Sequence, residues 1–203
     1  MAILIRDYIQ TFAAVFPEHA TALPWLVTKN LANILVQKIS TLTSDYLIQD
    51  NIAIHKTAGI EEGAILKAPL IISENCQVGA HAYLRGGVYL GAGTRVGPGC
   101  EIKTTVIMAA SAVAHFNFLG DSIIGSYVNF EAGAVVANHY NERENKHISV
   151  LVNGQLTATN TEKFGALVGD YAKIGANAVL SPGTVLPAKA VVKRSELVQQ
   201  TPD

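Results

Sequence analysis

The sequence predicts an all-β solenoid, a parallel β-helix of six-residue repeats, with a small N-terminal helical cap and a projecting hairpin loop. Three observations lead to this prediction: an aliphatic residue recurs at every sixth position, glycine often follows it, and helical spacing is confined to the N-terminal segment. Period six is neither the 3.6 of an α-helix nor the alternation of a half-buried strand. We therefore expect a helical cap over residues 1–47, a β-helix over 48–194 with a hairpin inserted at about 137–163, and a tail over 195–203.

The N-terminal segment has helical spacing in place of the six-residue period. Its apolar residues fall three or four apart in two groups, which are Ile5, Tyr8, Ile9, Phe12 and Phe16, and then Leu31, Ile34, Leu35, Ile39 and Leu42. Asp7 is the expected N-cap of the first helix, and a turn at Pro17–Pro24 separates it from the second. Because solenoids need capped ends, we expect these helices to form a cap. A docking surface for another subunit is the alternative.

Aliphatic residues mark the repeat positions from residue 48 onward. The first run contains Ile48, Ile54, Ile60, Leu66, Ile72, Val78, Leu84, Leu90, Val96 and Ile102. Two slips of one residue then give Ile107, Val113, Phe118, Ile124, Phe130 and Val136, and a second run contains Val168, Ile174, Leu180, Leu186 and Val192. Three such strands close one triangular coil of about 18 residues, whose stacking buries the aliphatic row. The general rule for parallel crossovers favours a right-handed coil.

A polar stretch interrupts the repeat at about residues 137–163. Within it, residues 148–152 and 155–159 flank Asn153–Gly154, the preferred sequence of a type I′ turn. A hairpin is therefore predicted to project from the coil wall. Long loops that leave a rigid scaffold often carry function.

The composition argues against several classes of function. The chain has 49% hydrophobic and only 15% charged residues, with a formal net charge of -1. No positive field is available for nucleic-acid binding, and no apolar run is long enough for a membrane span. Cys76 and Cys100 are expected to be buried packing residues, and the histidines show no shared spacing for a metal site. We expect a cytoplasmic protein without metal, nucleic-acid or membrane partners.

Two cations fall on one face of the predicted coils. Arg85 and Lys103 are 18 residues apart and each directly follows a repeat position, so they are expected on adjacent coils. Stacked cations repel each other unless an anion or a carboxylate intervenes. Either they are solvated or paired with Glu101, or they form an anion site, with phosphate the expected ligand. Phe118 is expected on the same face and His115 at a disturbed corner just before it, where this histidine is either structural or functional.

Several segments, taken in order, resemble a known family. They are Tyr83–Gly87, Val96–Lys103, His115–Asp121, Ile124–Gly133, Ala137–Asn138 and Gly165–Asp170. Together they resemble left-handed β-helix (hexapeptide-repeat) acyltransferases. The stretch from Val78 to Leu186 is similar to the acetyltransferase domain of bifunctional sugar-1-phosphate nucleotidylyltransferase/acetyltransferases, including the glucosamine-1-phosphate enzymes. The resemblance implies a left-handed β-helix, acetyl-CoA as co-substrate, an amino-sugar phosphate as acceptor, and a homotrimer whose active site lies between subunits.

The resemblance also implies roles for individual residues. His115 is implied as the general base. Arg85 and Lys103 are implied to hold the sugar phosphate. The other implied substrate-binding residues are Phe118, and Asn129 and Asn138 near the sugar and the acetyl group. Those implied in binding coenzyme A are Ala132, Ala176, Lys193 and Arg194.

Two positions depart from the family pattern. Phe118 stands where many glucosamine-phosphate enzymes have tyrosine, and His139 stands where tyrosine usually follows the asparagine, so the exact sugar stays open. A nucleotidyltransferase domain is not expected, because the 47 N-terminal residues cannot encode one. The predicted reaction is direct acetyl transfer to the amine of an amino-sugar 1-phosphate. The alternatives are a nucleotide-linked amino sugar as acceptor, or a non-catalytic β-helical assembly subunit.

The low charge content leads to one further expectation. Every coil commits residues to an aliphatic interior, which accounts for part of the missing charge. An uncharged outer face of the prism is expected to be buried between the subunits of a trimer. The stacked cations Arg85 and Lys103 would then remain available to bind phosphate.

Overall fold

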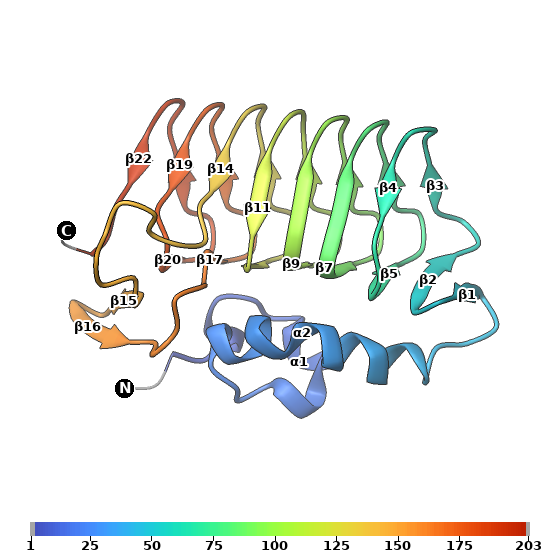
Figure 1. Cartoon of the computed structure of the whole chain (residues 1–203), viewed down its shortest axis with the longest axis horizontal. Helices are drawn as coiled ribbons and strands as arrows, with labels where there is room; N and C mark the ends of the chain where they lie inside the picture. The colour runs from blue at the N-terminus through green and yellow to red at the C-terminus, as the bar shows by residue number, and fades with distance from the viewer. Residues whose placement is uncertain (1–2, 202–203) are drawn as a thin grey trace.

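The computed structural model describes residues 3–201 and has the architecture of a parallel β-helix with helices along one side (Figure 1). The coils advance from the β3 end to the β22 end (Figure 1). The fold is that of a left-handed β-helix. The all-β solenoid and the handedness implied by the resemblance are therefore confirmed. The general rule for parallel crossovers, which favours a right hand, does not hold for this coil.

The strands form three parallel stacks, one for each face of a triangular prism. The helix face contains β2 (Ile52–His55), β5 (Leu70–Ile72), the second halves of β7 (Tyr83–Leu90) and β9 (Glu101–Ile107), β12 (Ile123–Ile124), β17 (Ala166–Val168) and β20 (Thr184–Leu186). The cation face contains β4 (Ile65–Leu66), the first halves of β7 and β9, β11 (Phe118–Gly120), β14 (Val135–Val136), β19 (Val179–Leu180) and β22 (Leu197–Val198). The third face contains β3 (Gly59–Ile60), β6 (Gln77–Val78), β8 (Arg95–Val96), β10 (Ala112–Val113), β13 (Asn129–Phe130), β18 (Lys173–Ile174) and β21 (Val191–Val192).

The aliphatic repeat residues stack inside the prism, with one shift from the predicted phase. Ile102 lies in register with Leu119, 17 residues later, so the coil shortens here. Leu119 is fully buried in the interior cluster, whereas Phe118 is half-buried and lies in register with the outward Glu101. The prediction of Phe118 as a repeat position is therefore wrong. The shortened connection follows Leu119 and leads to Ile124, rather than preceding β11.

The β-helix starts later and ends later than the repeat predicted. β1 (Tyr46–Gln49) pairs antiparallel with β2, and Ile48 is 47% exposed, so Ile48 is not an interior position. At the other end, β22 extends the coil into the segment predicted as a tail. Residues 202–203 of that tail and residues 1–2 of the predicted cap lie outside the described residues.

The N-terminal segment contains less helix before residue 20 than its spacing predicted. The structure has two 3-10 turns, η1 (Ile5–Asp7) and η2 (Pro17–His19), around a short α1 (Phe12–Val15). Asp7 ends η1 and caps no helix, so that prediction is wrong. The long helix is α2 (Pro24–Ile39), which begins with proline at a position that needs no hydrogen bond from its nitrogen. In the part of the chain that the structure describes, every helix is too short or too polar to cross a membrane.

The helices lie along the helix face and not across an end of the coil stack (Figure 1). Leu31 and Leu35 of α2 are fully buried. They belong to a cluster with the outward residues of the helix face, which are Ala53, Ile71, Tyr89, Val106, Ile123, Leu167 and Val185. Gly87 permits close approach, since a β-carbon there would lie 3.2 Å from the backbone nitrogen of Ala32. The uncharged outer face is therefore covered by this chain's own helices, and not by another subunit as the composition suggested.

The predicted hairpin is present as β15 (Ser149–Val152) and β16 (Gln155–Ala158). Its turn residues Asn153 and Gly154 have φ of 50° and 76°, as a type I′ turn requires. The hairpin leaves the coil but does not stand free. Ile148 and Val150 are buried in the same cluster as α2, while β16 is exposed along its whole length.

Candidate functional site

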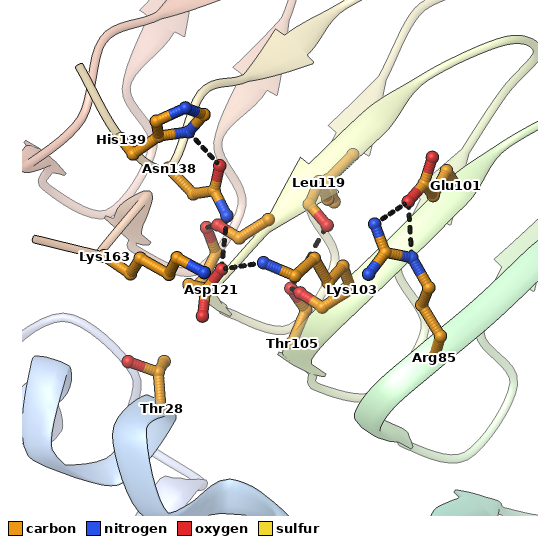
Figure 2. Close-up of polar contacts among 12 residues, drawn as sticks. Thr28, Arg85, Glu101, Lys103, Thr105, Leu119, Asp121, Asn138, His139 and Lys163 are labelled. Carbon is orange, nitrogen blue, oxygen red and sulfur yellow. Dashed lines mark hydrogen bonds and ion pairs between the residues drawn. The ribbon is translucent and has the colours of Figure 1, made fainter. Parts of the chain in front are cut away.

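The two predicted cations lie side by side on the cation face. Arg85 of β7 is in register with Lys103 of β9. Each has a carboxylate partner (Figure 2): Arg85 Nη2 lies 2.6 Å from Glu101 Oε1, and Lys103 Nζ lies 3.1 Å from Asp121 Oδ2. The Arg85 guanidinium also lies 5.6 Å from the centre of the Tyr83 ring. The pairing with Glu101 that the sequence left open is thus present, but only for Arg85.

Asp121 is the centre of a polar network that the sequence did not single out. It is buried, it has a positive φ of 46°, and its backbone N–H donates to Lys103 O. Its carboxylate accepts hydrogen bonds from Lys103 Nζ and Asn138 Nδ2 (Figure 2). The amide oxygen of Asn138 lies 3.3 Å from Nδ1 of His139. The structure therefore brings Lys103 and Asn138 together, with Asp121 holding both.

His115 lies at a corner between β10 and β11, as the sequence predicted. Its side chain is exposed, and its carbonyl accepts hydrogen bonds from Asn117 Nδ2 and Gly133 N. Within residues 3–201 the imidazole makes no hydrogen bond or ion pair with Arg85, Lys103 or any other group. The ring is therefore open to solvent and to a ligand.

Phe118 and Asn129 occupy different faces. Phe118 lies on the cation face, between Glu101 and Val135 in register. Asn129 is exposed on the third face, between Ala112 and Lys173. Within one chain the structure does not bring Asn129 to the cation pair.

The residues implied in coenzyme A binding gather at the corner that follows β13 and β18. Phe130 of β13 is in register with Ile174 of β18, and the same register places Ala132 beside Ala176. The backbone N–H of Asn177 donates a hydrogen bond to Ala132 O. Arg194 follows β21 on the next coil and forms a forked contact with Glu131, at 2.7 Å from Nε to Oε2 and 2.8 Å from Nη2 to Oε1. Lys193 is exposed beside it.

Glu131 is the second carboxylate that sequence reasoning missed. It accepts a hydrogen bond from Ala176 N at 2.9 Å as well as the Arg194 fork. The Arg194 side chain, followed by the Ala176 N–H, lowers the pKa of Glu131 to about 2. The available signal was position, because Glu131 directly follows the interior Phe130 just as Lys103 follows Ile102.

Both thiols are buried and unlinked. Cys76 Sγ lies 3.1 Å from Gly91 O and Cys100 Sγ lies 3.2 Å from Ala114 O. Burial raises the pKa of Cys76 to about 11 and also raises the pKa of Cys100. They are protonated at neutral pH and offer no nucleophile. Among residues 3–201, no three histidine, cysteine or carboxylate side chains converge as metal ligands would.

Comparison with known proteins assigns the chain to a family. The family described as the GMPPB C-terminal domain matches residues 68–200. A bifunctional sugar-1-phosphate nucleotidylyltransferase/acetyltransferase from Sulfurisphaera tokodaii is 29% identical over 165 residues, which are 81% of this chain and 40% of that protein. The bifunctional protein GlmU of Heliobacterium modesticaldum is 35% identical over 128 residues, which are 62% of this chain and 27% of that protein. The chain thus spans less than half the length of these relatives.

Among solved structures, one similar to this chain is a mutant perosamine N-acetyltransferase from Caulobacter crescentus in complex with CoA and GDP-perosamine. It is 15% identical, with a TM-score of 0.37, over 86% of this chain and 69% of that one. The family match covers more than half of the chain, including every strand that carries the site from β7 onward. The resemblance to the acetyltransferase domain of the bifunctional enzymes is thereby confirmed, and the chain belongs to the family of the GMPPB C-terminal domain.

Proposed function

We propose that this chain transfers an acetyl group from acetyl-CoA to the amine of an amino-sugar 1-phosphate. The observation that carries the proposal is the stacked pair Arg85 and Lys103 beside Asn138, in a chain whose relatives are named acetyltransferases. Arginine and lysine bind phosphate oxygens through short, charge-assisted hydrogen bonds. Phosphate oxygens would replace part of the contacts that Glu101 and Asp121 make now.

In the proposed reaction, the acceptor amine attacks the thioester carbonyl of acetyl-CoA. His115 takes a proton from the attacking nitrogen, the carbon–sulfur bond breaks, and the departing sulfur receives that proton from His115, so that coenzyme A leaves as the thiol. The open imidazole of His115 suits this role, which typically contributes about 10²–10⁴-fold to the rate. A backbone N–H of the coil wall would hold the oxyanion, worth about 3 kcal/mol. No acyl-enzyme is expected, because the thiols of Cys76 and Cys100 are buried and protonated.

The proposed site is completed by a second subunit. The cation pair, Asn129 and the Glu131–Arg194 corner lie at separate places around one prism. A homotrimer would bring the corner of one subunit to the cation face of its neighbour. Coenzyme A would then lie along Ala132 and Ala176, with its phosphates near Lys193 and Arg194.

The direct test measures coenzyme A release with glucosamine-1-phosphate and galactosamine-1-phosphate as acceptors. The proposal expects turnover with at least one of them and a large loss in the His115→Ala variant. Unchanged turnover in this variant would overturn the mechanism. If acetyl-CoA fails to raise the melting temperature and no acceptor is acetylated, the chain is a non-catalytic assembly subunit.

A nucleotide-linked amino sugar is the second candidate acceptor. One observation favours it: a hollow opens beside Lys103, between the cation face and α2. A bare sugar 1-phosphate has no group that needs this space.

A further inference from the structure

The hollow beside Lys103 is built from parts of the chain that are far apart in sequence. It has a volume of about 480 Å³, within the range of small-ligand pockets. It is lined by residues of α2, by Gly86 at the bulge of β7, by Lys103 and Thr104 of β9, by Asp121, and by residues 161–163, which follow the hairpin. The charged residues that line it are Lys29, Lys103, Asp121, Glu162 and Lys163.

The charge in the hollow is unbalanced in favour of cations. Asp121 is already engaged by Lys103 and Asn138. Lys29 and Lys163 are exposed, and within residues 3–201 their ammonium groups make no hydrogen bond or ion pair. Figure 2 shows the Lys163 side chain pointing toward Asp121 from one side, while Lys103 approaches Asp121 from the other. Three lysines thus face two carboxylates, Asp121 and the exposed Glu162, and the net positive charge of the hollow suits an anion.

The elements that carry these lysines are held firmly. Leu31 and Leu35 anchor α2 in the core, and the missing side chain of Gly87 lets its backbone approach. Lys163 is followed by the buried Phe164 and by Gly165, whose N–H donates to Asp121 O at 2.9 Å. The backbones that carry Lys29 and Lys163 are therefore held in place relative to Lys103.

We propose that this hollow is a second phosphate subsite for the acceptor, with Lys29 and Lys163 as its binding residues. The inference rests on the proposed acetyl transfer and chooses between its two acceptors. The phosphate next to the sugar would lie on Arg85 and Lys103, and a second phosphate, linked to it, would lie between Lys29 and Lys163. The preferred acceptor is then an amino sugar linked to a nucleoside diphosphate, in place of the bare sugar 1-phosphate of the proposed reaction.

The test compares two acceptors that share one sugar, an amino-sugar 1-phosphate and the same sugar linked to UDP, with acetyl-CoA saturating. The variants are Lys29→Gln and Lys163→Gln. Lys146→Gln is the matched control, since Lys146 is an exposed lysine of the inserted segment that does not line the hollow. We expect each hollow variant to raise KM for the UDP-linked sugar about tenfold with kcat little changed, and to raise KM for the bare sugar phosphate much less.

The outcomes separate this inference from the proposed function. If the wild type acetylates neither acceptor, the proposed function fails. If it acetylates them but both hollow variants match the control, or affect the two acceptors equally, the second subsite is wrong while the acetyl transfer stands. If the variants instead raise KM for acetyl-CoA, the hollow binds a phosphate of coenzyme A, which also overturns the inference. Titration of UDP alone into the three variants gives a readout independent of turnover, with weaker binding expected only in the hollow pair.

Discussion

The helix face and the cation face of the prism share the strands β7 and β9 but have opposite outer surfaces. The second halves of β7 and β9 point Tyr89 and Val106 outward into the core under α2. The first halves of the same strands point Arg85 and Lys103 outward to the carboxylates of Glu101 and Asp121. The inward residues are aliphatic on both faces. What lies outward on each strand therefore decides whether a face stabilises the fold or carries chemistry.

The largest expected effect is a loss of activity without a loss of stability, at the corner that carries His115 next to the cation face. His115→Ala should lower kcat for acetyl transfer by about 10²–10⁴-fold through loss of the general base. Because the side chain is exposed, the melting temperature should hardly change. Coenzyme A release and a thermal melt on the same preparation measure both. His147→Ala, an exposed histidine of the inserted segment, should leave both unchanged; a large fall in the melting temperature of His115→Ala would point to a structural role.

The helix face should respond in the opposite way. Leu35→Ala removes a fully buried side chain from α2 and should lower the free energy of unfolding by about 2–5 kcal/mol. Leu26→Ala on the same helix, where the side chain is 44% exposed, should cost much less. Urea denaturation measures the pair. Similar losses in the two variants would mean that α2 does not bury its apolar side against the helix face.

Within the cation face, the two ion pairs should differ in strength. The side chains of Lys103 and Asp121 are 17% and 10% exposed, and those of Arg85 and Glu101 are 36% and 34% exposed. Asp121→Asn should lower the free energy of unfolding by about 1–3 kcal/mol, because a mostly buried ammonium loses its charged partner. Glu101→Gln should cost about 0–1 kcal/mol, since water screens that pair. Equal losses in urea denaturation would contradict this ranking.

The smallest effect is a pH dependence at the coenzyme corner. The pKa of Glu131 is lowered from 4.5 to about 2, so its charged form favours the folded state. This contribution is complete above about pH 5 and is lost as the pH falls toward 2. It is small because Arg194 and Glu131 are open to solvent and salt. The difference in urea midpoint between wild type and Glu131→Gln should shrink from pH 5 to pH 2. The control variant is Glu144→Gln, whose carboxylate lies in an exposed loop. A difference in midpoint that stays constant with pH would rule out the ion pair as its source.

The interior of the fold was predictable at single-residue resolution except where the coil changes length and at Ile48, whose strand pairs antiparallel before the coil begins. Phe118 and Leu119 are both large and apolar, so a five-residue connection before β11 and one after it leave equally good patterns. Only the pairing of Leu119 with Ile102 distinguishes them. The cations and the corner histidine were found because the coil period converts separation in sequence into adjacency.

The carboxylate partners were harder to find. Asp121 lies in a segment that the resemblance already included, but its contact with Lys103 depends on a backbone with positive φ at the end of β11. Glu131 meets Arg194, 63 residues away, because the hairpin insertion between them leaves the coil and returns to it. The six-residue period cannot be followed through this insertion, so spacing along the sequence does not show that Glu131 and Arg194 are close.

The sequence by itself determined the solenoid, the aliphatic interior, the hairpin turn and the family, because each depends on local pattern: a period, a turn dipeptide, or an ordered set of motifs. Only the tertiary structure decided where the N-terminal helices lie, since helical spacing defines an apolar side but not the surface that it covers. That decision also explains the low charge content, because one outer face of the prism is buried under α2. The same packing places Lys29 beside Lys103 and forms the hollow, a juxtaposition of two segments that no spacing along the chain could indicate.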